Sequence, residues 1–311
     1  MNEKLINRLL PFFGLGILTV SLWALNKELR HYQLSEVIKS IKAISLYRLS
    51  LAMVFTTLGY LAFASYDLIA FRYLKYSLSK RKILFTAFLT HAISNVVGFA
   101  TLSGGAVRYR FYSHWGVPAR LIALIIAFEN LCFWLGLFAV GGVTFLIEPL
   151  TLPSLLKLPF VSVHPIGFIF LLIVFTYLIL CAVRKQPLVI KGQSFAIPTF
   201  SSSLVQITVS FIDWAFAAGV LYILLPNQIP LSYPGFFGIY LLAMIVSIIS
   251  HVPGGLGVFE TVTLLLLPQS INSAKVLGSL LAFRAVYYIL PFIIAMLLFG
   301  AYEIKRRWGR V

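Results

Sequence analysis

Residues 94–115 read SNVVGFATLSGGAVRYRFYSHW, and this stretch decides how the fold is interpreted. An apolar segment, 83–102, runs into Ser103-Gly104-Gly105 and continues only as a short segment, 106–117. That continuation is too short to cross a membrane comfortably, because crossing takes about 20 apolar residues. An apolar segment that is broken by glycines and followed by a short one is typical of a re-entrant hairpin or a broken helix. We therefore predict a hairpin over 83–117 with its tip at Gly104 and Gly105.

A second stretch has the same form. Residues 235–252 are apolar, run into a Pro-Gly-Gly sequence and continue over 256–267. The decapeptide HVPGGLGVFE, 251–260, places Glu260 in the first turns of the helix that follows, where the helix dipole favours an ionised carboxylate. We predict a second hairpin over 235–268, with a tip formed by Pro253, Gly254, Gly255 and Gly257.

The composition of the chain identifies the surroundings of these hairpins. Of 311 residues, 60% are apolar and 11% are charged, and the mean hydropathy is +0.96. Soluble domains average about 45–50% apolar and about 25% charged residues, so an ordinary soluble protein and a disordered chain are both excluded. Lys and Arg number 25 against 9 Asp and Glu. A nucleic-acid-binding domain would not carry 27 Phe, so we predict an integral membrane protein with basic residues at the lipid surface and no nucleic-acid partner.

The other apolar stretches predict six full spans in an all-α polytopic fold: 9–26, 49–74, 119–147, 164–183, 200–225 and 275–302. The first lacks a small-x-small cleavage site, so we interpret it as an uncleaved helix. If neither hairpin crosses the membrane, the basic loops 75–82 and 184–191 and the basic C-terminus share one side, which predicts that both termini are cytoplasmic. The exception is 27–48, a basic segment on the opposite side, whose core over 34–42 has the spacing of an amphipathic helix lying on the membrane.

Two units of the chain can be laid over each other. The first has Asp67 in a span, then the Gly104-Gly105 hairpin with Arg110 five residues past the second glycine, and Glu129 in the next span. The second has Asp213, then the Gly254-Gly255 hairpin with Glu260 five residues past the second glycine, and Arg284. Basic and acidic residues are thus exchanged between each hairpin and the span after it. The topology makes the units antiparallel, which is typical of the inverted repeats of transporters, whose site lies where the repeats meet.

This repeat divides the chain into four parts. Residues 1–48 hold the first helix and the amphipathic helix, and 49–147 form the first repeat. Residues 148–198 are a connecting helix and a cytoplasmic loop, and 199–311 form the second repeat with its basic tail.

Six charged residues of the two units lie inside predicted membrane segments: Asp67, Arg110, Glu129, Asp213, Glu260 and Arg284. A charge at the bilayer centre costs about 2.5–3.5 kcal/mol, so six facing lipid would cost about 15–20 kcal/mol. A whole domain is stable by only about 5–15 kcal/mol, so these side chains must face inward and be paired or hydrated. Four acids against two arginines leave a surplus of negative charge, which a proton or water must offset. Purely structural ion pairs are the alternative to a functional site.

Arg108 and Arg110 follow the first glycine pair on its short helix. They are about 200° apart around a helix, so both cannot face one point. We expect one of them to face the interior and the other to meet phosphates at the cytoplasmic surface. The start of this helix presents free N–H groups and the positive end of its dipole, which makes it a candidate anion site. Tyr109 and Tyr112 fit an interfacial aromatic belt.

Enzyme motifs are weak in this sequence. Ser103-Gly104 and His251 superficially resemble the serine and histidine of intramembrane serine proteases, but Thr101 stands where that motif has glycine. Phosphate-binding loops and dinucleotide fingerprints are missing as well. Three scattered histidines lack metal-ligand spacing and are interpreted as packed or interfacial: His91, His114 and His164. We therefore expect no catalytic residues, no metal site and no cofactor.

Five segments together carry a family resemblance: 65–68 (SYDL), 104–110 (GGAVRYR), 191–193 (KGQ), 251–260 (HVPGGLGVFE) and 281–288 (LAFRAVYY). They resemble the YbhN family, which is similar to the transmembrane flippase region of MprF, the lysylphosphatidylglycerol synthase and flippase. The resemblance covers roughly residues 50–300. It implies a bacterial inner-membrane protein with a flippase-like fold that handles lipid headgroups. MprF also has a soluble aminoacyl-transferase domain that the resemblance does not reach, so we expect no synthase activity.

The resemblance also supplies site candidates, by match to the family motifs: Arg108, Arg110, Glu260 and Arg284. The repeat adds Asp67, Glu129 and Asp213. Our leading hypothesis is a lipid flippase-like transporter whose site binds the headgroup of an anionic phospholipid or a polyprenyl-phosphate lipid. One alternative is an ion- or proton-coupled transporter of a small anionic solute, in which a surplus acid such as Glu260 is the coupling site. The other is a non-transporting membrane scaffold whose charges are only structural.

Overall fold

A computed structural model describes residues 34–98, 100–148, 150, 162–184, 188–190, 193–195, 198–226, 230–250, 252–268 and 271–308. The expected first helix, 9–26, and His251 lie outside the described residues.

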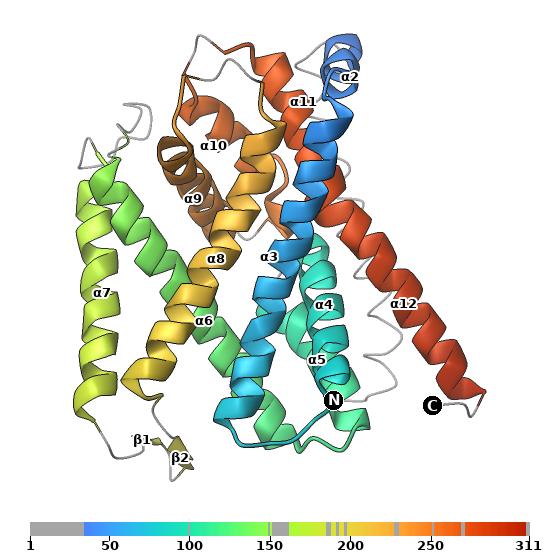
Figure 1. The fold of residues 1–311 in the computed structure, drawn as a ribbon, viewed down its shortest axis with the longest axis vertical. Helices are drawn as coiled ribbons and strands as arrows, with labels where there is room; N and C mark the ends of the chain where they lie inside the picture. Colours follow the sequence, from blue (N-terminus) through green and yellow to red (C-terminus); the bar gives the residue numbers. More distant parts are fainter. Residues whose placement is uncertain are drawn as a thin grey trace.

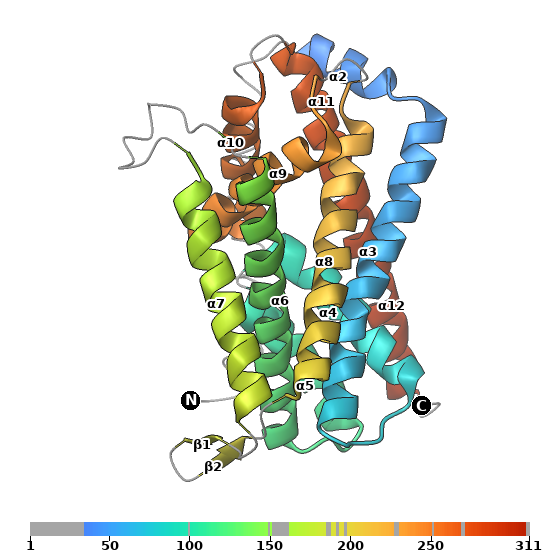
Figure 2. The same cartoon turned by 60° about the vertical axis from the view of Figure 1, so that its left-hand side comes forward.

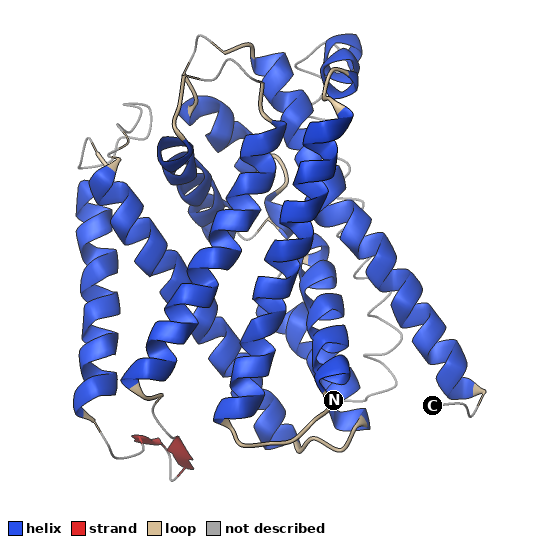
Figure 3. Cartoon of the chain, viewed as in Figure 1, coloured by secondary structure: helices blue, strands red, loops and turns tan. Residues whose placement is uncertain are grey.

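The described residues form helices almost throughout (Figure 3). The first half contains α2 (Leu34–Lys42), α3 (Leu46–Tyr73), α4 (Lys80–Val97), α5 (Ala100–His114), α6 (Ala119–Ile147) and α7 (His164–Val183). The second half contains α8 (Phe200–Leu224), α9 (Tyr233–Ser250), the 3-10 turn η2 (Pro253–Gly255), α10 (Val258–Leu266), α11 (Ser273–Phe283), the π-helical segment η3 (Arg284–Ile289) and α12 (Leu290–Arg307). A short antiparallel hairpin, β1 (Leu188–Ile190) with β2 (Gln193–Phe195), lies in the loop before α8 and was not predicted.

Six helical stretches among the described residues are long and apolar enough to cross a membrane: Leu46–Tyr73, Ala119–Ile147, His164–Val183, Phe200–Leu224, Tyr233–Ser250 and Ser273–Arg306. Five of them match predicted spans. The sixth, α9, is the first arm of the predicted second hairpin, and its 18 residues are themselves long enough to span. The predicted all-α polytopic fold is therefore confirmed, and the chain is a multi-pass membrane protein.

Helices α3 and α8 lie side by side at the centre of the molecule and run antiparallel (Figures 1 and 2). Two glycines lie at this contact, and the tighter approach is at Gly219. A Cβ atom at Gly59 would lie 3.5 Å from the Cβ of Phe216, and one at Gly219 would lie 2.7 Å from the Phe55 ring. At the N-terminal end of α3, Arg48 donates hydrogen bonds to the carbonyls of Ile223, at 2.7 Å, and Leu225. These carbonyls end α8 without helical partners, so Arg48 satisfies them and fixes the register of the pair.

Two broken-helix pairs lie in opposite halves of the molecule. Figure 1 shows α4 and α5 beside the lower half of α3, and α9 and α10 beside the upper part of α8. In the second pair the break falls where predicted, because Gly254, Gly255 and Gly257 have φ angles of 59°, 61° and 78°. Such left-handed backbone is accessible to glycine at little steric cost.

In the first pair the predicted position of the break is wrong. Gly104 and Gly105 lie inside α5, and the chain turns at Gly98, whose φ is 76°. Gly104 serves helix packing instead. A Cβ atom at Gly104 would lie 2.8 Å from the Oγ of Ser94 and 3.0 Å from the Cγ2 of Thr90, so α5 packs closely against α4 and a larger residue at this position would force Ser94 or Thr90 to shift.

The two breaks contact each other. A Cβ atom at Gly98 would lie 3.0 Å from the Cα of Pro253, and one at Gly254 would lie 3.4 Å from the carbonyl oxygen of Asn95. The end of α4 and the turn η2 therefore meet backbone to backbone, and the residues on either side of each break gather in one place.

Candidate functional site

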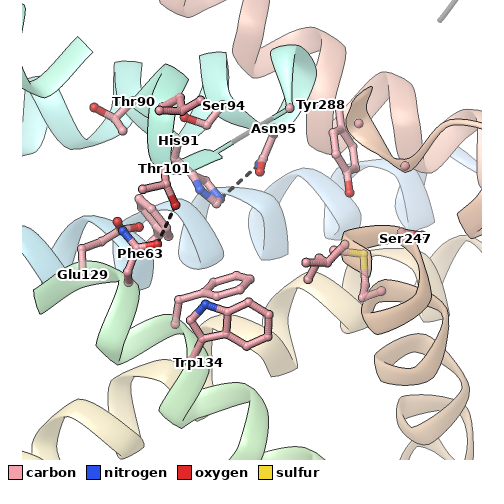
Figure 4. Close-up of a pocket in the computed structure, with 18 of the residues that line it drawn as sticks. Phe63, Thr90, His91, Ser94, Asn95, Thr101, Glu129, Trp134, Ser247 and Tyr288 are labelled. Carbon is pink, nitrogen blue, oxygen red and sulfur yellow. Dashed lines mark hydrogen bonds between the residues drawn. The ribbon is translucent and has the colours of Figure 1, made fainter. Parts of the chain in front are cut away.

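A cavity of about 370 Å³ lies where the two breaks meet. Figure 4 shows Thr90, Ser94 and Asn95 of α4 on one side of it and Trp134 of α6 and Ser247 of α9 on the facing side. Residues of α3, α5, η2, α10 and η3 complete the lining: Phe63, Thr101, Leu102, Arg108, Gly254, Gly255, Phe259 and Tyr288. The cavity is thus built from both halves of the chain.

Arg108 lies at the centre of the first charged cluster and is 1% exposed. Its Nε bonds both carboxylate oxygens of Asp67 at 3.1 Å, and its Nη2 bonds Oδ1 of Asp67 at 2.9 Å. The hydroxyl of Tyr112 donates to Oδ2 of Asp67 at 2.6 Å. The pair is therefore held in bidentate geometry, which is the strongest arrangement for an arginine and a carboxylate.

Glu129 joins this cluster more loosely. Its Oε2 lies 3.5 Å from Nη1 of Arg108, and its side chain is 12% exposed whereas that of Asp67 is fully buried. Glu129 and Arg108 both line the cavity. Nη1 is therefore the part of the guanidinium group that has the weakest protein partner.

Glu260 and Arg284 form the second charged cluster. The Nε of Arg284 donates to Oε1 of Glu260 at 2.7 Å, and its two Nη atoms donate to the carbonyls of Gly254 and Gly255. Oε2 of Glu260 accepts the backbone N–H of Gly257 at 2.8 Å, which completes a cap at the start of α10. All three nitrogens of this arginine are engaged, so the cluster holds the second break in shape.

Asp213 lies apart from both clusters and does not line the cavity. It is 5% exposed, and its Oδ2 accepts the hydroxyl of Tyr66 at 2.8 Å. Its Oδ1 has no hydrogen-bond partner among the described residues.

Arg110 is not brought into the cavity. Its Nη2 bonds Oε1 of Glu303 on α12 at 2.7 Å, and its side chain is 43% exposed. The expectation that Arg108 and Arg110 face opposite ways is confirmed. The prediction that Arg110 is one of the charged residues that face inward beside the intramembrane acids is wrong. Arg108 is the arginine that pairs with Glu129 of the next helix, as Glu260 pairs with Arg284. The prediction chose Arg110 because it counted five residues from Gly105, and this glycine does not form the break.

Several polar residues of the site were not singled out from the sequence. Tyr112, interpreted as an interfacial residue, is fully buried on Asp67. His91 is packed on the Phe63 ring, as expected of a packed histidine, but it also lines the cavity beside Asn95. Further polar lining comes from Thr101, which donates to Asn130, and from Thr90 and Ser94, whose hydroxyls have no partner among the described residues. The polar run Ser94-Asn95, just before Gly98, was the sequence signal that could have indicated this polar lining.

Metal binding has no candidate in the part of the chain that the structure describes, where no group of three or more His, Cys, Asp or Glu could hold an ion. The chemistry available in the cavity is therefore hydrogen bonding and charge pairing, from hydroxyls, amides and the Arg108–Glu129 pair.

Several known proteins are similar to this chain in sequence. An uncharacterised protein of Synechocystis sp. is 49% identical over 94% of this chain and 90% of its own length. The inner membrane protein YbhN of Escherichia coli is 29% identical over 84% of this chain and 82% of its own length. The phosphatidylglycerol lysyltransferase of Staphylococcus xylosus is 27% identical over 99% of this chain, which corresponds to 36% of that enzyme. The chain thus spans about a third of the lysyltransferase.

The family relationship rests on a match over most of the chain. Residues 12–295 match the family described as the lysylphosphatidylglycerol synthase transmembrane region, which includes both broken-helix pairs and both charged clusters. The resemblance to YbhN and to the lysyltransferase is confirmed by the relatives above. The chain belongs to the lysylphosphatidylglycerol synthase transmembrane-region family.

Proposed function

We propose that this chain is a flippase-like lipid transporter, and that the cavity binds the headgroup of an anionic, phosphate-bearing lipid such as a phospholipid or a polyprenyl-phosphate lipid. The observation that carries the proposal is the mixed lining of the cavity. Polar groups of α4 and Arg108 line it together with Leu102, which is 74% exposed, and Trp134, which is 38% exposed. A lipid has the same two parts, a polar head and apolar chains, whereas a small solute needs only a polar site.

Arg108 is the proposed ligand of the phosphate. Guanidinium groups bind phosphate oxygens through paired hydrogen bonds, and within the described residues the partner of Nη1 of Arg108 is Glu129, at 3.5 Å. A phosphate that reaches Nη1 replaces Glu129 while Asp67 continues to hold the rest of the guanidinium group. Arg284 is a poorer candidate because its Nε and both Nη atoms are already bonded within the protein. Glu129 is therefore the proposed exchangeable partner.

The two broken pairs give this site a way to face both membrane surfaces. We interpret α4 with α5, and α9 with α10, as re-entrant hairpins of an inverted repeat whose breaks meet near the middle of the bilayer. In this proposal the contact between Gly98 and Pro253 closes the cavity toward one end of the molecule. A rocking movement of one half of the molecule against the other would close it toward the opposite end instead. Phosphatidylglycerol, named in the activity of the staphylococcal relatives, is an anionic phosphate lipid and a suitable first probe.

Reconstitution in vesicles tests the proposal. Vesicles containing fluorescent phosphatidylglycerol are prepared with wild-type protein, with Arg108→Lys or with Arg110→Ala, and movement between leaflets is followed by chemical quenching of the outer leaflet. Arg108→Lys keeps the charge but loses the paired hydrogen bonds, so we expect movement slowed about tenfold to a hundredfold, which corresponds to about 1.5–3 kcal/mol for a charged hydrogen bond. Arg110→Ala is the matched control from the same helix and should retain the wild-type rate.

Two outcomes would overturn the proposal. Movement in wild-type vesicles no faster than in protein-free vesicles would favour the scaffold alternative. Equal rates for wild type and Arg108→Lys would remove Arg108 from the headgroup site.

A further inference from the structure

Asp213 differs from the other buried acids in having no positive partner. Asp67 and Glu129 share Arg108, and Glu260 has Arg284. Among the described residues, no basic side chain contacts Asp213, and only the hydroxyl of Tyr66 bonds its carboxyl group. The titratable groups near it on the packed elements are neutral or acidic: Tyr60 and Tyr66 of α3, Glu129 of α6, Tyr240 of α9 and Tyr287 of η3.

An unpaired carboxylate is unstable in such surroundings. A buried ion without a partner loses its hydration and gains nothing in return, so the group takes up a proton rather than remain charged. Oδ1 of Asp213, the oxygen without a hydrogen bond among the described residues, is the free position for that proton. A metal ion is a poor substitute because the same part of the chain offers no cluster of ligating side chains.

A line of buried polar side chains leads along α8 to Asp213. Ser203, Gln206 and Ser210 precede it at spacings of three, four and three residues, so all four lie on one face of the helix. Tyr177 of α7 donates to Oε1 of Gln206 at 2.8 Å and accepts the hydroxyl of Ser203 at 3.3 Å. The Nε2 of Gln206, like Oδ1 of Asp213, has no hydrogen-bond partner among the described residues.

This line begins at one end of the molecule. Helix α8 starts at Phe200, next to the β1–β2 hairpin at the bottom of Figure 1, and Ser203 lies in its first turn. A polar face of this kind is costly inside a membrane helix and is typical of ion and proton pathways. Ser210 also donates to the carbonyl of Cys132 at 2.8 Å and packs against Gly136, so it holds α8 against α6 as well as lying on this polar face.

We propose that Asp213 is a proton-binding site, protonated in the conformation described here, and that Ser203, Gln206 and Ser210 form the route by which it exchanges its proton with water at the β-hairpin end. One proton moves between water and Oδ1 of Asp213, and no other bond changes. A proton bound and released in each conformational cycle couples that cycle to the proton gradient across the membrane. The proton site does not rest on the lipid proposal, and its test does not use transport.

Infrared difference spectroscopy of the protein in lipid nanodiscs tests this site. At neutral pH the wild type should show the carbonyl band of a protonated carboxylic acid, which shifts in D₂O. The band should be lost in Asp213→Asn and retained in Glu303→Gln, the control at an acid that is paired with two arginines. Absence of the band from the wild type, or its persistence in Asp213→Asn, would overturn the proposal.

Two further variants, one of them with a control, test the proposal if Asp213→Asn does not fold. Tyr66→Phe keeps the acid but removes the hydrogen bond to Oδ2, so the band should move to higher frequency, and an unmoved band would contradict the assignment to Asp213. Gln206→Leu should slow the exchange of the band in D₂O, whereas Val205→Leu, on the exposed face of α8, should not. Equal exchange in Gln206→Leu and wild type would remove the proposed route.

Discussion

At the residue scale, the two intramembrane arginines differ in how completely their hydrogen bonds are used. Arg284 bonds one carboxylate and two backbone carbonyls, and among the described residues its partner Glu260 pairs with no other cation. Arg108 instead has two acids, and one of them, Glu129, is held at only 3.5 Å. The second cluster is therefore a closed structural unit, and the first has an acid that can be exchanged.

This difference predicts unequal costs for removing one acid. Glu260→Gln leaves Arg284 as an uncompensated buried charge, so we expect the free energy of unfolding to fall by about 3–5 kcal/mol. Asp67→Asn should cost less, because Arg108 retains Glu129 as its counter-charge. Glu303→Gln weakens two partly exposed pairs, with Arg110 and Arg306, and should cost about 0–1 kcal/mol. Thermal or denaturant unfolding in detergent measures all three, and a larger loss for Asp67→Asn than for Glu260→Gln would contradict the account.

The roles of single residues were only partly predictable from the sequence. Helical geometry correctly separated Arg108 from Arg110, because the angle between neighbouring positions is fixed by the backbone. It could not tell which one faces inward, since that depends on where Asp67 and Glu129 lie after folding. The partners Tyr66 and Tyr112 were missed because a tyrosine in an apolar helix has the same appearance in sequence whether its hydroxyl reaches water or a buried acid.

At the element scale, the position of the helix break was predicted correctly in the second broken-helix pair and wrongly in the first. Pro253 precedes Gly254 and Gly255 and cannot donate a helical hydrogen bond, so the second break has a local cause. In the first hairpin the choice lay between the single Gly98 and the pair Gly104-Gly105. Packing decides between them, because Gly104 faces Thr90 and Ser94 across the α4–α5 contact. The residues next to Gly104 in the sequence do not reveal this contact.

The two neighbouring glycines of α5 give a test of this assignment. A Cβ atom at Gly105 meets only Ile126, at an ordinary 3.5 Å, so Gly105→Ala should stabilise the protein by about 0.5–1 kcal/mol through helix propensity. Gly104→Ala places its Cβ 2.8 Å from Ser94, so it should destabilise by about 1–3 kcal/mol through overpacking. Unfolding of the two variants in parallel measures the difference. A loss of stability in Gly105→Ala would instead support a helix break at Gly104 and Gly105.

At the scale of the whole molecule, the order of charged residues in the two units anticipated a site shared by both halves, and the structure adds how they meet. The breaks contact each other, and the cavity is lined from both sides of that contact. The sequence order alone could not supply this contact, because it joins residues 95–98 to residues 253–254, which are far apart in the chain and meet only through tertiary packing. The antiparallel pair α3 and α8 provides the frame that brings them together.

The basic residues are also unequally shared between the two ends of the molecule. The end that carries the C-terminus of α12 in Figure 1 holds Lys75 of the loop between α3 and α4, the basic first turn of α4 with Lys80, Arg81 and Lys82, and the basic last turns of α12. At the opposite end the described basic residues are fewer, and one of them, Arg48, is used to bond carbonyls of α8. Because cytoplasmic loops carry the excess of Lys and Arg, the end with the C-terminus of α12 is the predicted cytoplasmic one.

Labelling of single cysteines tests this orientation. The native Cys132 and Cys181 are buried and are replaced by alanine, and one new cysteine is placed at Ser77, in the basic loop, or at Ser273, at the start of α11. We expect a membrane-impermeant maleimide to label Ser273→Cys in intact spheroplasts and Ser77→Cys only after permeabilisation, since the two exposed positions lie at opposite ends of the membrane-spanning helices. The reverse pattern would invert the topology, and with it the side of the membrane from which Asp213 receives its proton. Labelling of both in intact spheroplasts would show that the two ends do not lie on opposite sides.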